Sequence, residues 1–273
     1  MNRDTLVVTL SDMHSGSNFA LFPDRFVEFA ESKQVHAPKG AQLRIWKHFE
    51  YCAREVLKAR KDKRLIIVIN GDAIEGNRYG LSTVCTLLEK EQIDIHTELM
   101  TWFKRAVDYR RGDLLYYTLG TEVHTNSGED VIGEKMGAVQ ADDNLYAFNE
   151  LKLTINDRRI WWVHHGPVSG KGANKGNGFR NWLRNIYYDT VNEGQEPPHM
   201  IISGHTHDPY WQIFIARYKG AYFPVRGLIS PSWQQKTRYA YKVAPLTLNK
   251  VGLQYFVIHA GGDIGDPVEL VMI

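Results

Sequence analysis

Apolar residues fall into short runs that alternate, in the first half of the chain, with longer segments of helical periodicity. Runs of mostly aliphatic and aromatic residues at 5–10, 65–69 and 114–119 predict buried strands. Between them, segments 42–61 and 82–111 repeat apolar residues every three or four positions, which predicts two helices. Because a helix that crosses between two strands of one sheet leaves them parallel, the first half is expected to form a βαβαβ unit.

The second half of the chain is richer in predicted strands. Tight-turn pairs at Asn156-Asp157 and Lys219-Gly220 predict hairpins. The predicted strands are 145–155, 159–163, 199–202, 210–217, 221–226, 253–259 and 268–273, with helices at 130–139 and 179–192. Segment 18–39 contains Pro23 and Pro38 and predicts a loop with a short helix. With neither a repeat nor a linker, we expect one α/β domain over residues 1–273, built on two sheets.

Composition narrows the class of protein. The 273 residues carry 33 Lys and Arg against 31 Asp and Glu, so the chain lacks the strongly basic balance of many nucleic-acid-binding domains. Cys52 and Cys85 lie in predicted helices without metal-binding or redox spacing, which favours a reduced compartment. The N-terminus has no signal-peptide pattern, and no apolar stretch has the length of a membrane span. We expect a soluble, cytoplasmic protein without a membrane partner.

Residues able to bind metal follow five of the predicted strands. Ser203-Gly204-His205-Thr206-His207 shows the pattern best, because residues i and i+2 of extended chain point to the same side. Taken alone, each such group also fits a capped turn or a solvated loop histidine. The five groups, each at the end of a strand, are Asp12 with His14; Asp72; Thr121, Glu122 and His124; His164 with His165; and His205 with His207.

Together these groups predict a metal centre. All offer oxygen or imidazole donors and none a thiolate, which suits hard or borderline cations. A carboxylate that bridges two adjacent cations would suit phosphoryl displacement, since paired metals stabilise both the attacking and the leaving oxygen. We therefore expect two divalent cations, with Mn²⁺ favoured and Fe, Zn²⁺ or Mg²⁺ as alternatives.

A basic, glycine-rich segment lies between the fourth and fifth of these strand ends. Residues 169–178 contain Lys171 and Lys175 but lack the order of a Walker motif. Two interpretations stay open, a phosphate-binding loop or a surface linker. We expect Lys171 and Lys175, with Arg180 and Arg78, to steer an anionic substrate.

In order along the chain, Asp12-x-His14, Gly71-Asp72, Gly120 with His124, His164 and Gly204-His205-x-His207 resemble the motifs of the calcineurin-like metallophosphoesterase superfamily. The resemblance extends from Asp12 to His207 and implies a two-sheet sandwich flanked by helices on both faces, a four-layer αββα fold. It also implies that Asp12, His14 and His207 hold one metal, that Asp72 bridges, and that His205 with His164 or His165 holds the second. His164 is favoured because it comes first after its strand.

One segment departs from the family pattern of Gly-Asn-His followed by an acidic residue. The chain has Gly120-Thr121-Glu122-Val123-His124, so either Thr121 or Glu122 would replace the asparagine ligand. The resemblance implies that metal-activated hydroxide attacks phosphorus and that His124 protonates the leaving oxygen.

The favoured function is hydrolysis of a phosphodiester in a nucleic acid or nucleotide, that is, a nuclease or related phosphodiesterase. Support for this substrate is the basic segment and aromatic residues near the site that could stack on bases. The alternatives are a phosphomonoesterase, including a protein phosphatase, and a non-catalytic scaffold that keeps the fold. The oligomeric state is left open.

Overall fold

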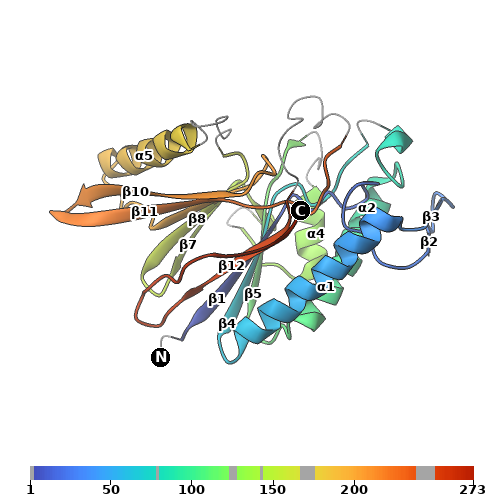
Figure 1. The fold of residues 1–273 in the computed structure, drawn as a ribbon, viewed down its shortest axis with the longest axis horizontal. Coiled ribbons are helices and arrows are strands. Elements are labelled where there is room, and N and C mark those ends of the chain that lie inside the picture. The colour runs from blue at the N-terminus through green and yellow to red at the C-terminus, as the bar shows by residue number, and fades with distance from the viewer. Residues whose placement is uncertain (1–2, 78–79, 123–127, 142–143, 167–175, 238–249) are drawn as a thin grey trace.

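The computed structural model describes residues 3–77, 80–122, 128–141, 144–166, 176–237 and 250–273. Two β-sheets pack face to face, with helices on the outer face of each (Figure 1). The chain therefore has the four-layer αββα arrangement that the sequence predicts, and the predicted fold class is confirmed.

The larger sheet has six strands in the order β13-β12-β1-β4-β5-β6. Its central strands are buried along nearly their whole length, as expected for strands covered on both faces. β1, β4, β5 and β6 run parallel, whereas β12 and β13 are antiparallel additions. The strands are β1 (Thr5–Ser11), β4 (Arg64–Asn70), β5 (Leu114–Thr118), β6 (Ala147–Phe148), β12 (Val251–Ile258) and β13 (Val268–Met272).

The smaller sheet has five strands in the order β10-β11-β9-β8-β7. Its central strands β8 and β9 are parallel, and hairpins complete both sides. The strands are β7 (Glu150–Ile155), β8 (Arg158–Val163), β9 (Met200–Ser203), β10 (Tyr210–Tyr218) and β11 (Ala221–Ile229). Trp162 is fully buried between the sheets and donates its indole N–H to Thr9 Oγ1 at 3.0 Å.

Helices cover the outer faces unequally. α1 (Gly40–Arg60), α2 (Glu89–Ala106) and α4 (Gly128–Met136) enclose one apolar core against the larger sheet. Among the helices that the structure describes, α5 (Asn177–Asn192) is the one that packs on the smaller sheet (Figure 1). No helix among the described residues is long and apolar enough to cross a bilayer.

Three local predictions are wrong. Segment 18–39 contains no helix; its regular structure is the short pair β2 (Val27–Glu28) and β3 (Val35–His36). The strand predicted at 145–155 is two strands, because β6 pairs with β5 in the larger sheet whereas β7 belongs to the smaller.

The third error is the start of the second helix, predicted at residue 82. Residues 80–82 instead form the 3-10 turn η1 (Gly80–Ser82), and α2 begins only at Glu89. The segment between them bonds to the loop after β1: Asn18 N–H donates to Thr83 O at 2.7 Å, and Cys85 N–H to Gly16 O at 2.8 Å. These distant hydrogen bonds hold the backbone out of the helix.

Candidate metal centre

The two sheets bring the ends of five strands to one edge of the sandwich. β1 and β4 are in parallel register from Thr5 with Arg64 to Ser11 with Asn70, so their following loops leave the sheet side by side. His14 N–H donates to Asp72 O at 2.9 Å, which ties those two loops together. Across the sandwich, Gly204 N–H donates to His164 O at 3.0 Å and joins the loops after β8 and β9.

Asp12 lies at the centre of this edge and is fully buried. Its Oδ1 lies 3.0 Å from His164 Nε2 and 3.2 Å from His207 Nε2. The backbone N–H of His205 donates to both carboxylate oxygens, at 3.0 and 3.1 Å. The Ser11 hydroxyl donates to Oδ2 as well. Asp12 thus connects the strand ends of both sheets.

Three overlapping groups of donor atoms could each hold a cation. Within each group the donor atoms lie within 4.8 Å of one another. Asp12 belongs to two groups and His164 to two, so the groups are neighbours. The groups are Asp12, His14 and His207; Asp12, Asp72 and His164; and His164, His165 and His205.

The arrangement fits a cation better than it fits packing. Nε2 of His14 and Nε2 of His207 face each other at 3.4 Å, and Asp12 supplies a buried carboxylate to the same group. His14 is 3% exposed and Asp72 is 2% exposed, so these charged or polar groups gain little from water. Oxygen and imidazole donors of this kind suit Mn²⁺, Fe or Zn²⁺.

The backbone at the centre is itself unusual. Positive φ angles are uncommon for residues other than glycine, although Asp and His tolerate them better than most. Twelve non-glycine residues of the described chain have a positive φ, and five of these are Asp12, His14, Asp72, His205 and His207. A left-handed conformation costs an L-residue about 1–2 kcal/mol, so the surrounding structure enforces it.

Glycines make room for the centre. A Cβ on Gly204 would meet the Ser11 hydroxyl and lie 2.8 Å from Asp12 Oδ2 and 3.0 Å from His164 Cδ2. A Cβ on Gly120 would meet the backbone nitrogen and Oδ1 of Asp72. Gly204 does not have a positive φ, so the close approach of these side chains is the reason for glycine there.

Neighbouring charges shift the pKa values of Asp12 and His14 in opposite directions. Burial favours the neutral form of Asp12, but the imidazoles of His164 and His207 outweigh it and hold the pKa of Asp12 well below its usual value. Burial likewise favours neutral His14, but Glu75, Asp72 and Asp12 raise the pKa of His14 to about 9. Without metal, Asp12 is therefore ionised and His14 protonated at neutral pH.

The other histidines differ among themselves. Burial opposes the charged form of His164, yet Asp12 and Asp72 raise its pKa. Burial first, and then the charge of His164, lower the pKa of His165 and of His205. His165 and His205 are therefore neutral at pH 7, the state in which imidazole binds metal.

Thr121 and Glu122, which stand where the family pattern has asparagine and its neighbour, lie in different surroundings. Thr121 N–H donates to Asp72 Oδ1 at 2.6 Å, and Thr121 Oγ1 lies 3.2 Å from His165 Nε2. Glu122 is exposed and belongs to none of the three donor groups formed by described residues. Of the two predicted substitutes for asparagine, only Thr121 is placed against Asp72.

Most of the predicted substrate-binding residues lie outside the part of the chain that the structure describes. His124, the predicted acid, and Arg78, Lys171 and Lys175 lie outside the described residues. Arg180 is exposed in the first turn of α5. Gly176, which precedes α5, lies so close to Tyr210 that a Cβ would meet the Tyr210 hydroxyl, so this helix begins near the loop that carries His207.

Sequence reasoning missed Glu75 and Gln234. Glu75 is 5% exposed, and its Oε2 lies 2.8 Å from His14 Nδ1. Gln234 Nε2 donates to Glu75 Oε2 at 2.6 Å and to Ser17 Oγ at 3.0 Å. The only local clue to Glu75 was an acidic residue three positions after Asp72, and nothing local indicated Gln234.

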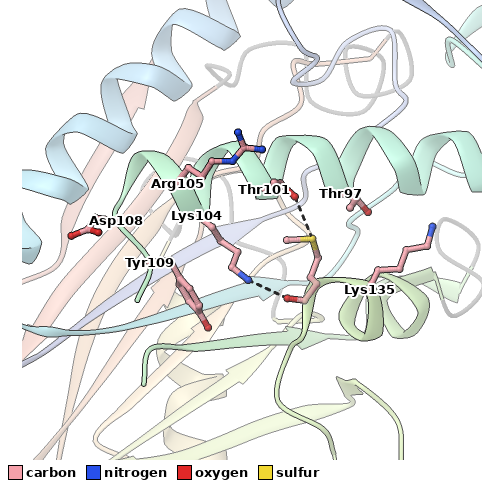
Figure 2. Close-up of a pocket in the computed structure, with 8 residues that line it drawn as sticks. Thr97, Thr101, Lys104, Arg105, Asp108, Tyr109 and Lys135 are labelled. Carbon is pink, nitrogen blue, oxygen red and sulfur yellow. Dashed lines mark hydrogen bonds between the residues drawn. The ribbon is translucent and has the colours of Figure 1, made fainter. Parts of the chain in front are cut away.

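A separate pocket lies between α2 and α4, with a volume of about 580 Å³ (Figure 2). None of its lining residues belongs to the five strand ends. Its partly buried Lys104 is already engaged, donating to Met136 O at 3.1 Å and lying 4.4 Å from the Tyr109 ring centroid. The pocket therefore does not extend the metal centre.

Comparison with known proteins gives similar structures but no related sequence. No family model matches the chain, and no curated protein matches it. Vps29 from Chaetomium thermophilum is 10% identical with a TM-score of 0.33, over 98% of this chain and 100% of that one. A metallophosphoesterase from Sphaerobacter thermophilus is 11% identical with a TM-score of 0.32, over 97% of this chain and 88% of that one.

A third similar structure is a 5'-nucleotidase from Candida albicans, 12% identical with a TM-score of 0.35. The match covers 94% of this chain but 47% of the nucleotidase, so the chain spans about half its length. In its four layers and in the order of its strand-end residues, the chain resembles the calcineurin-like metallophosphoesterase superfamily. All three TM-scores are below 0.5, and the site is interpreted from its own geometry.

Proposed function

We propose that the chain is a metal-dependent phosphoesterase that hydrolyses phosphate esters at a centre of two divalent cations. The observation that supports this is the overlap of donor groups at Asp12 and His164, which favours neighbouring cations over a single isolated one. Bound there, two such cations would supply Lewis acidity toward both water and the phosphoryl oxygens of a substrate.

The protein groups have distinct parts in this proposal. Asp12, His14 and His207 would hold one cation, His205 with His164 or His165 would hold its neighbour, and Asp72 would bridge the two. The His205 amide fixes the Asp12 carboxylate, and the Thr121 amide fixes that of Asp72. These bonds orient the carboxylates in advance, so little reorganisation is needed when metal and substrate bind.

The finer proposal is that the substrate is a phosphodiester of a nucleic acid or nucleotide, with Mn²⁺ as the favoured metal and His124 as the acid that protonates the leaving oxygen. The basic segment 169–178 and the exposed Arg180 support an extended anionic substrate. A phosphomonoesterase is the second candidate, because the three donor groups themselves would serve either ester.

The test compares bis(4-nitrophenyl) phosphate with 4-nitrophenyl phosphate as substrates of the full chain supplied with Mn²⁺. A diesterase should turn over the first faster, whereas a monoesterase should prefer the second. Asp72→Asn should lower kcat by more than about 100-fold, since even outer-shell partners of a metal commonly cost 10–100-fold.

The matched control is Asp94→Asn, which removes an exposed carboxylate of α2 that pairs with Lys135. It should leave activity unchanged. Metal analysis of the purified chain completes the test: metal bound without turnover of either ester would favour the scaffold, and absence of bound metal would reject the centre.

A further inference from the structure

The strand β10 forms an open edge of the smaller sheet. It is the last strand in the order β10-β11-β9-β8-β7, and β11 is its only partner among the described strands. The hairpin of β10 and β11 extends away from the body of the sandwich (Figure 1). At nine residues it is long for an edge strand, and Arg217 is the only charged residue in it. Long apolar edges invite pairing with another strand, and monomeric proteins usually protect them with charges, proline or bulges.

The two faces of β10 differ in their surroundings. Phe214 and Ala216 are buried against α5 with the core of that layer. The alternate residues point to the opposite face and are exposed: Trp211 by 58%, Ile213 by 39% and Ile215 by 62%. β11 adds Tyr222, which is 75% exposed and opposite Arg217, and the exposed Pro224 opposite Ile215.

The hairpin register shows which backbone groups are available at the edge. Lys219-Gly220 is a two-residue turn, so Tyr218 and Ala221 form its closing, hydrogen-bonded pair. Hydrogen-bonded and non-bonded pairs alternate along an antiparallel ladder. The residues that direct their N–H and C=O groups to the open edge are therefore the odd-numbered ones, Trp211, Ile213, Ile215 and Arg217. The C=O of Arg217 already accepts the Tyr187 hydroxyl at 2.7 Å, so the groups left for pairing are chiefly those of Trp211, Ile213 and Ile215.

We propose that two copies of the chain pair antiparallel through β10, about a twofold axis at Phe214, and so join two five-stranded sheets into one. In this register Ile213 lies opposite Ile215 of the partner subunit, and Trp211 lies opposite the partner subunit's Arg217. The first pair is apolar, and the second matches an indole to a guanidinium, a favourable cation–π pair. The same residues meet on both copies, as a twofold interface requires.

The position of Arg217, the one charged residue of β10, favours pairing with a second copy of the chain over pairing with an unrelated strand. Arg217 lies three positions from the axis and Trp211 three positions on the other side, so pairing a copy in this register brings no two arginines opposite each other. Like charges placed opposite each other would destabilise the ladder. The exposed Tyr222 lies 5.3 Å from the Arg217 guanidinium, measured from its ring centroid, and extends the aromatic surface at each end of the interface.

The oligomeric state of the full chain tests the proposal. Light scattering after size exclusion should give twice the mass of one chain for the wild type, and the mass of one chain for Ile213→Lys/Ile215→Lys. The matched control, Leu43→Lys/Leu57→Lys, places the same charges on exposed leucines of α1 and should remain a dimer. Circular dichroism and thermal unfolding establish that both variants are folded.

Cysteine cross-linking tests the register. Cys52 and Cys85 are buried, and burial raises the pKa of each thiol to about 12, so introduced cysteines react selectively. Ile213→Cys/Ile215→Cys should form a disulfide-linked dimer under mild oxidation, whereas Leu43→Cys/Leu57→Cys should not.

A monomeric wild type overturns the proposal and leaves the edge of β10 to a different partner. A dimer that survives the lysine substitutions, or one without cross-linking, also overturns it. None of these three outcomes bears on the phosphoesterase proposal, since no donor of the metal centre is changed.

Discussion

Oε2 of Glu75 lies 2.8 Å from Nδ1 of His14, on the side of the imidazole opposite the donor group that contains Asp12 and His207. A carboxylate on Nδ1 fixes the orientation of the ring and leaves Nε2 directed at the centre. Gln234 in turn donates to the same oxygen of Glu75 at 2.6 Å. The ring of His14 is thus held by a buried polar chain before any cation binds.

Removing this support should weaken metal binding. We expect Glu75→Ala to lower Mn²⁺ affinity by about 10–100-fold, the usual effect of losing an outer-shell partner. Glu75→Gln should lose less, because its amide oxygen still accepts the Nδ1 proton. Isothermal titration calorimetry measures both. Glu98→Ala, which removes an exposed partner of Arg25, is the control; equal affinity of Glu75→Ala and wild type would show that Glu75 does not position His14.

Metal binding should release protons and weaken at low pH. Its carboxylate neighbours raise the pKa of His14 from the ordinary 6.5 to about 9 in the metal-free protein, so it is protonated at pH 7.5. A ligating imidazole must be neutral, so binding should displace about one proton from His14. Affinity should therefore fall as pH falls from 9 toward 6.5. Titration in buffers of different ionisation enthalpy counts the protons, and a pH-independent affinity would contradict the prediction.

The same pKa affects the stability of the metal-free protein. Because the pKa of His14 is raised on folding, its contribution to stability is fully present below about pH 6.5 and is lost as pH rises through about 9. In His14→Gln this part of the pH dependence should disappear from urea unfolding curves.

Gly204→Ala should damage the centre by crowding alone. The added methyl group would meet Ser11 and lie 2.8 Å from Asp12 Oδ2. We expect the free energy of unfolding to fall by about 1–3 kcal/mol, as for other overpacked sites, and Mn²⁺ binding to weaken. Gly261→Ala is the control, since its Cβ would have no neighbour within 4 Å. Wild-type metal affinity in Gly204→Ala would show that the site accommodates the methyl group.

Much of the framework follows from local sequence. β1, β4 and β5 are nearly continuous apolar runs, and each ends where glycine or polar residues begin, so their order and direction are predictable. Parallel strands end at the same edge of a sheet, which is why Asp12 and Asp72 could be expected to lie together. The alternation rule does not apply to His205 and His207, because both have a positive φ instead of an extended backbone, and they belong to different donor groups.

The parts that sequence did not predict depend on contacts between distant segments. Gln234 reaches Glu75 across 159 positions, and no local pattern anticipates such a bond. The late start of α2 arises because the carbonyl of Thr83 and the amide of Cys85 bond to Asn18 and Gly16 in the loop after β1. That Asp12 is shared by two of the donor groups also depends on how the sheets are packed, which periodicity does not determine.

The donors of the centre are divided between the two sheets, with Asp12, His14 and Asp72 following strands of the larger and His164, His205 and His207 following strands of the smaller. Cations held by both sets would link the two sheets, in addition to the apolar contacts between them and to hydrogen bonds such as Trp162 to Thr9 and Gln254 to Ser230. Ligand that binds only the folded chain stabilises it in proportion to the logarithm of its concentration. Removing the metal with a chelator should therefore weaken the contact between the two sheets. Proteases should then cleave the metal-free chain faster than the metal-bound chain.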